Sequence, residues 1–149
     1  MTDLWHNFAI LFCWGLQFLW TWWFLCISIV LFLNLAIASA WTMSRRSVYW
    51  EHKYWVVFLP LLAYPAIAFA GAIAWNTGVP VPPLDRPAPN AIAEWCVLIL
   101  NIVSVGFGII LIFKMRHLRW FSVSVFLFIQ WVLTGINFMV AMPIGGVWL

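Results

Sequence analysis

The chain has 149 residues, of which 66% are hydrophobic and only 7% are charged. A soluble domain carries roughly 25% charged residues. Seven basic and four acidic side chains cannot cover the surface of a water-soluble chain of this length. Soluble enzymes, nucleic-acid-binding proteins, secreted disulfide scaffolds and disordered proteins are therefore excluded. The composition predicts an all-α integral membrane protein with a single transmembrane domain over residues 1–149.

The first apolar run, residues 4–41, is too long for one helix that crosses a membrane upright. At about 1.5 Å per residue it would extend about 57 Å, against a hydrocarbon core of roughly 30 Å. The pattern favours an N-terminal helical extension, interfacial or strongly tilted, that leads into one span over residues 16–41. The alternative divides the run into two short spans, five in all. That arrangement requires a turn near residues 21–23, where no glycine, proline or charge favours one.

Three later apolar segments, residues 55–75, 91–113 and 121–142, each have the length that a membrane-spanning helix needs. Together with the first run they predict a four-helix transmembrane bundle. Residues 76–90, between the second and third of these spans, hold five of the eight prolines. Because proline fixes φ and removes a hydrogen-bond donor, this outer loop is predicted to be a stiff spacer. A docking surface for a neighbouring protein is the alternative interpretation.

The formal net charge of +3 comes from basic residues that are sorted between the connections, which indicates membrane orientation rather than nucleic-acid binding. Six of the seven lie in or beside the first and third connections: Arg45, Arg46, Lys53, Lys114, Arg116 and Arg119. The seventh, Arg86, lies in the second. Under the positive-inside rule, residues 42–54 and 114–120 are predicted to be cytoplasmic and both termini to lie outside. The bacterial inner membrane is the expected location.

Thirteen tryptophans make the chain tryptophan-rich. Twelve fall near the ends of the predicted spans, where indole rings form the aromatic belts of membrane proteins. Only Trp131 is expected near the middle of a span. Five lie between residues 5 and 23, where the aromatic belt is the simpler interpretation and a surface that faces lipid, a pigment or a quinone is the alternative. No bound cofactor is predicted.

Polar side chains within the last two spans form two faces at helical spacing. One face carries Asn101, Ser104 and Gly108, and the other carries Gln130, Thr134, Asn137 and Ala141. Small residues let two helices approach closely, so these faces predict a packed helix pair with a hydrogen bond between Asn101 and Gln130. The alternative is a polar path or ligand pocket lined by Asn101, Gln130, Thr134 and Asn137.

Glu94 is the only acidic residue placed within a span, about one turn into the third. An intramembrane carboxylate is a candidate functional group, so Glu94 joins the four residues of the alternative pocket as a tentative intramembrane site. Its position in the first turn also suits the helix dipole. Solvation of a helix end is therefore the simpler interpretation of Glu94.

Two prolines, Pro60 and Pro65, lie within the second predicted span and are expected to kink it. Tyr64 lies between them near the middle of the membrane. Because the bilayer interior provides no water, the Tyr64 hydroxyl is expected to need a hydrogen-bond partner within the protein.

The chain is predicted not to be an enzyme, because no serine, cysteine, histidine or carboxylate constellation supports catalysis. No metal site is predicted, since the three cysteines have no metal-ligand spacing. The leading hypothesis is a small accessory or assembly subunit of a larger membrane complex, such as a bioenergetic or photosynthetic one, with lipids and other membrane subunits as partners. The alternative is a small oligomeric transporter or channel that uses Glu94 and the Asn101, Gln130 and Asn137 faces.

Overall fold

The computed structural model describes residues 2–45, 52–77, 80–81, 86–87, 90–115 and 118–145. Helices account for nearly all of them: α1 (Thr2–Phe18), α2 (Trp22–Arg45), η1 (His52–Leu62), α3 (Ala63–Thr77), α4 (Ala91–Lys114) and α5 (Arg119–Gly145). The 3-10 helix η1 leads directly into α3. Two short strands, β1 (Pro80–Val81) and β2 (Arg86–Pro87), pair antiparallel in the proline-rich connection, with Pro80 opposite Pro87.

Four helical segments of the described residues are long and apolar enough to cross a membrane: Phe24–Thr42, Val56–Asn76, Ala91–Lys114 and Arg119–Ile144. The prediction of an all-helical fold with four such helices is thus confirmed for this part of the chain. We call the end of the bundle where α3 ends and α4 begins the proline-loop end. The opposite end, where Lys114 closes α4 and Arg119 opens α5, is the basic end.

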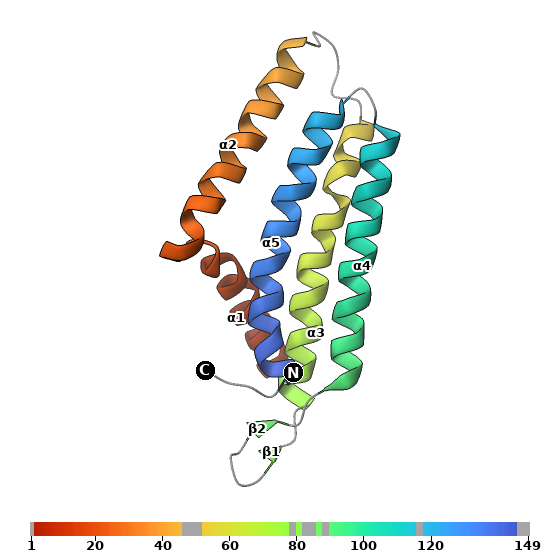
Figure 1. Ribbon diagram of the computed structural model, residues 1–149. Helices are drawn as coiled ribbons and strands as arrows, with labels where there is room; N and C mark the ends of the chain where they lie inside the picture. The colour runs from red at the N-terminus through yellow and green to blue at the C-terminus, as the bar shows by residue number, and fades with distance from the viewer. Residues whose placement is uncertain are drawn as a thin grey trace.

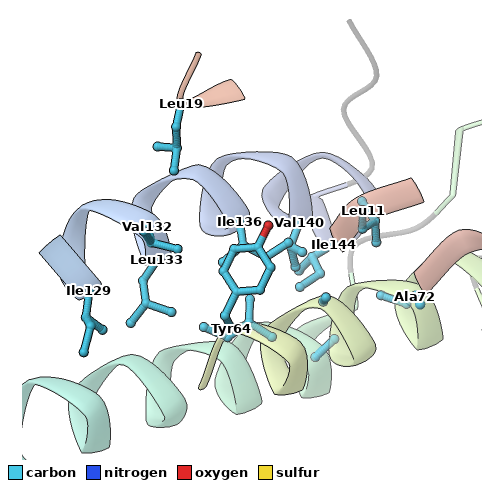
Figure 2. Close-up of a cluster of buried hydrophobic side chains, with 14 of the residues drawn as sticks. Leu11, Leu19, Tyr64, Ala72, Ile129, Val132, Leu133, Ile136, Val140 and Ile144 are labelled. Carbon is cyan, nitrogen blue, oxygen red and sulfur yellow. The ribbon is translucent and has the colours of Figure 1, made fainter. Parts of the chain in front are cut away.

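Helix α5 is central to the fold. It packs against α1, α2, α3, α4 and η1, whereas the main contacts of α2 are with α5 alone. Figure 1 shows α3, α4 and α5 side by side, with α1 beside α5 near the proline-loop end and α2 leaning away from the bundle. The core contains Leu11 from α1, Tyr64 and Ile67 from α3, and Ile136 and Val140 from α5. In Figure 2 the Tyr64 side chain rises from α3 toward Ile136 and Val140.

The first apolar run does not form one uninterrupted helix over residues 16–41, as the expected span implied. A tight turn at residues 19–21 divides it into α1 and α2. The amides of these three residues donate to carbonyls three positions earlier, at 3.0–3.2 Å. The Thr21 hydroxyl donates to the Phe18 carbonyl at 2.8 Å. A threonine side chain therefore supports the turn that no glycine, proline or charge was available to make.

One side of helix α1 packs against the bundle at the buried residues Leu11 and Gly15, and Leu19 is buried in the turn that follows. Gly15 allows this close approach. A Cβ atom at this position would lie 2.7 Å from the Tyr64 hydroxyl and 3.0 Å from the Ile136 Cα. The Tyr64 hydroxyl donates to the Phe12 carbonyl, which is the partner its position required.

Helices α1 and α2 follow α5 in the antiparallel direction. Three contacts show the order, Gly15 with Ile136, Ser28 with Trp131, and Asn34 with Ser124. Helix α1 therefore covers the part of α5 nearer the proline-loop end, and α2 covers the part nearer the basic end. Together the two helices cover α5 as one helix with a break at residues 19–21 would.

A chain of hydrogen bonds satisfies the polar groups at this break. The Trp131 indole donates to the Ser28 hydroxyl at 2.9 Å, and that hydroxyl donates to the Leu19 carbonyl at 2.8 Å. The break leaves the Leu19 carbonyl without the amide that a continuous helix would provide. In a bilayer such a group must find a hydrogen-bond partner within the protein. Ser28 of α2 provides that partner, and Trp131 of α5 donates a hydrogen bond to Ser28.

The two prolines of the second span differ in their surroundings. Pro60 lies inside η1, and Pro65 lies in the first turn of α3. Because η1 leads directly into α3, each proline lacks an amide that could have donated to a carbonyl of the preceding helical turn. The expected irregularity in this span thus takes the form of a change from 3-10 to α geometry at Ala63.

We predict that Ser28→Ala lowers the free energy of unfolding by about 1–2 kcal/mol, because the Leu19 carbonyl and the Trp131 indole both lose their partner. Ser39→Ala is the matched control, since the Ser39 hydroxyl bonds only to the Leu35 carbonyl of its own helix. Reversible unfolding in detergent micelles measures both variants. Equal losses for the two would contradict the role of Ser28 at the break.

We predict that Gly135→Ala destabilises the fold by about 1–3 kcal/mol through overpacking. A Cβ atom there would overlap the Gly15 carbonyl oxygen and lie 3.1 Å from the Leu19 side chain. Gly106→Ala is the control because a Cβ at that position meets nothing within 4 Å. The control should leave stability unchanged or raise it by up to about 1 kcal/mol through helix propensity.

Candidate functional site

The helix pair α4–α5 carries all five residues of the tentative polar site. Its geometry begins with the local sequence of α4. The Asn90 side chain accepts from the Ala93 amide at 3.1 Å and caps the helix, Glu94 lies in the first turn, and Lys114 lies in the last turn. These charges complement the helix dipole at both ends. The backbone amide of Asn90 also donates to the Ile144 carbonyl at 3.0 Å, which joins the start of α4 to the end of α5.

Asn101 and Asn137 form a reciprocal amide pair between the two helices. Each side-chain nitrogen donates to the oxygen of the other residue, at 2.9 and 2.8 Å. Asn101 uses its second N–H to donate to the Val97 carbonyl at 2.8 Å. Both residues are half-buried. The pair joins the middle of α4 to α5 and uses most of the hydrogen-bonding capacity of the two amides.

The prediction that Asn101 bonds to Gln130 is wrong, because each residue has a different partner. The Gln130 amide instead donates to the Ser104 hydroxyl at 3.3 Å, while Asn101 bonds to Asn137, two helical turns further along α5. Axial register explains the difference. A Cβ at Gly108 would overlap the Phe126 ring, so this ring packs directly on Gly108 and fixes which turns of the two helices meet.

A groove of about 380 Å³ lies between α4 and α5, toward the proline-loop end. Its polar lining residues are Glu94, Asn101 and Asn137. Its walls are apolar and include Val97 and Leu98 of α4 and Val140 and Ala141 of α5. Glu94 and Asn101 are seven residues apart on one face of α4, which is about 10 Å along the axis. The groove therefore has a carboxylate near one end and amides near the other.

The other two residues of the tentative site lie apart from this groove. Gln130 bonds to Ser104, and the exposed Thr134 donates its hydroxyl to the Gln130 carbonyl of its own helix at 2.9 Å. The structure thus brings three of the five residues together, Glu94, Asn101 and Asn137. In the described part of the chain, hydrogen bonds within and between α4 and α5 engage Gln130 and Thr134.

A second hollow, of about 310 Å³, lies between η1, the start of α3 and α4. Its lining is apolar except for Ser104, whose hydroxyl already accepts from Gln130. Pro60 and Ala63 form part of its wall. With its one hydroxyl engaged, this hollow offers fewer polar groups than the groove.

Sequence reasoning missed the polar contacts that join α2 to α5. Asn34 donates to the Ser124 hydroxyl at 3.2 Å, and Ser28 accepts from Trp131. A signal was present, because Trp131 was the one tryptophan placed far from a span end. An indole N–H at that depth needs an acceptor on a neighbouring helix.

The described residues contain no group of three or more His, Cys, Asp or Glu side chains that could hold a metal ion. Cys13, Cys26 and Cys96 are free and exposed. The α4–α5 groove can instead provide a negative charge, amide hydrogen-bonding groups and apolar walls. That combination of groups suits an amphiphilic ligand.

We predict that a double-mutant cycle of Asn101→Leu and Asn137→Leu gives a coupling free energy of about 0.5–2 kcal/mol, the range for hydrogen bonds between membrane helices. The same cycle with Asn101→Leu and Gln130→Leu should give a coupling close to zero. Unfolding in detergent micelles measures both cycles. Coupling only in the second cycle would mean that α4 and α5 pack in a different register.

No protein-family model, no curated protein and no solved structure matches this chain. The fold and the α4–α5 groove are therefore the observations from which a function can be inferred.

Proposed function

We propose that the protein is a non-catalytic integral membrane protein that serves as a small accessory or assembly subunit of a larger membrane complex. The observation that supports this most is the position of α2. Only 6% of its membrane-length segment is buried within the chain, compared with 39% for the segments in η1–α3 and α5. A helix that contributes so little to its own core has most of its surface available for lateral contacts.

The outward surface of α2 is large and apolar. Val30, Phe32, Leu33 and Ile37 are each more than half exposed. In the lipid bilayer, apolar exposure alone does not drive association, so a partner must fit this surface by close packing. The connections between the helices are short, which leaves lateral helix contacts as the natural mode of association.

The orientation that we propose has both termini and the proline-loop end outside the cytoplasm, with residues 42–54 and 114–120 inside. Six of the seven basic residues lie in or beside the connections at one end, as the positive-inside rule requires. Lys114 and Arg119 lie at the basic end, and Arg86 lies in β2 of the proline-rich connection. Within this orientation, the bacterial inner membrane is the proposed location.

A small oligomeric transporter or channel is the second candidate, and the groove with Glu94 favours it. Asn101 and Asn137 are engaged with each other, and Gln130 is engaged with Ser104. A polar path through these residues would have to break those hydrogen bonds. The accessory-subunit proposal requires no such rearrangement and is therefore preferred.

We predict that the protein, solubilised gently from its source membrane, co-purifies with other membrane subunits at a fixed stoichiometry in native mass spectrometry. Leu33→Trp on α2 should remove the partner, because a bulky side chain disrupts close packing between helices. Ile102→Trp is the matched control on the exposed face of α4, where Ile102 is 61% exposed. It should keep the partner.

A monomer or homo-oligomer without partners would contradict the accessory-subunit proposal. Liposome flux that disappears in the Asn101→Leu/Gln130→Leu double variant would then support transport.

A further inference from the structure

The α4–α5 groove has two polar points at a fixed separation. Glu94 lies near the proline-loop end, and the Asn101–Asn137 pair lies about 10 Å further along the axis. We propose that this groove binds a phospholipid with a primary ammonium headgroup. The ammonium would pair with the Glu94 carboxylate, and the glycerol ester region would lie against Asn137. This proposal is independent of the accessory-subunit function.

Glu94 selects for a cation. Its side chain is exposed, and no ion pair with another described residue engages it. The next residue, Trp95, is 63% exposed, and exposed tryptophans at a helix end are typical of the membrane–water interface. The carboxylate is thus expected at headgroup depth, where an ammonium group is available and an anionic headgroup would be repelled.

Asn137 offers an N–H donor that no described residue engages. An amide NH₂ group carries two N–H donors. Asn101 uses both of its own, on Val97 and Asn137, whereas Asn137 donates to Asn101 through one. Among the described residues no acceptor engages the second N–H of Asn137. An ester carbonyl of a phospholipid that enters the groove is an acceptor of the right type.

The walls of the groove suit the apolar parts of such a lipid. Val97, Leu98 and Val140 line it, and the small Ala141 side chain leaves room beside α5. The groove lies on the surface of the bundle between two helices that face the bilayer, so a lipid can enter laterally while its acyl chains remain in the hydrocarbon. The distance between the two polar points is comparable to that between the headgroup nitrogen and the glycerol esters of an extended phospholipid.

Native mass spectrometry of the full-length protein in detergent, with added phosphatidylethanolamine or phosphatidylglycerol, tests this proposal. We expect the phosphatidylethanolamine adduct to dominate. Glu94→Gln should weaken its apparent affinity about tenfold, because a charge-assisted hydrogen bond is lost. Asp3→Asn is the matched control, since Asp3 is also exposed and in the first turn of its helix, α1. It should leave the affinity unchanged.

A second pair of variants tests the groove without changing charge. Ala141→Phe fills the groove and should remove the phosphatidylethanolamine adduct. Ala36→Phe makes the same change at an exposed position on α2 and should preserve it. Circular dichroism of both variants verifies that the helices remain folded.

Three results would overturn the proposal. The first is equal binding of phosphatidylethanolamine and phosphatidylglycerol by the unaltered protein. The second is full retention of the phosphatidylethanolamine adduct in both Glu94→Gln and Ala141→Phe. The third is binding of dodecylamine without binding of phosphatidylethanolamine, which would assign the groove to a lipophilic amine that is not a phospholipid.

Discussion

The hydrocarbon interior of a membrane provides no water, so each polar group that a helix break or a polar side chain exposes must find its partner within the protein. This constraint explains the main polar contacts of the bundle. The Ser28 hydroxyl donates to the carbonyl freed at Leu19 and accepts from Trp131, and Tyr64 donates to the Phe12 carbonyl. None of the buried side-chain nitrogen or oxygen atoms of the described residues lacks a hydrogen-bond partner. At the break between α1 and α2, Ser28 of α2 satisfies the Leu19 carbonyl and Trp131 of α5 donates to Ser28.

Close approach at glycine is what allows these hydrogen bonds to form. Gly15 and Gly135 bring the backbones of α1 and α5 together, and Gly71 accommodates Val140 and Leu11 where α1, α3 and α5 meet. Between membrane helices there is little hydrophobic driving force, so van der Waals packing of this kind has a large share in association. The same contacts place α1 in the core and leave α2 attached mainly through α5.

Two surfaces of different character follow from this arrangement. The outward face of α2 formed by Val30, Phe32, Leu33 and Ile37 is apolar, which suits a neighbouring transmembrane helix. The α4–α5 groove combines the Glu94 carboxylate with the Asn101–Asn137 amides, which suits a small amphiphile. The proposed partner site on α2 and the proposed lipid site in the groove therefore use different residues. Substitutions at Leu33 and at Ala141 can distinguish them.

The sequence by itself determined the helical class and the four apolar segments, because a membrane span needs a long run of apolar residues that is visible in one dimension. It also identified Glu94, Asn101 and Asn137 as polar residues within the predicted spans. The turn at residues 19–21 appears only in the tertiary structure, where local hydrogen bonds form it and the Trp131–Ser28 hydrogen bond, between residues distant in sequence, joins it to α5. The partner of Asn101 was decided there as well. Helical periodicity determines which residues share a face, but only packing such as that of Phe126 on Gly108 determines the axial register in which two faces meet.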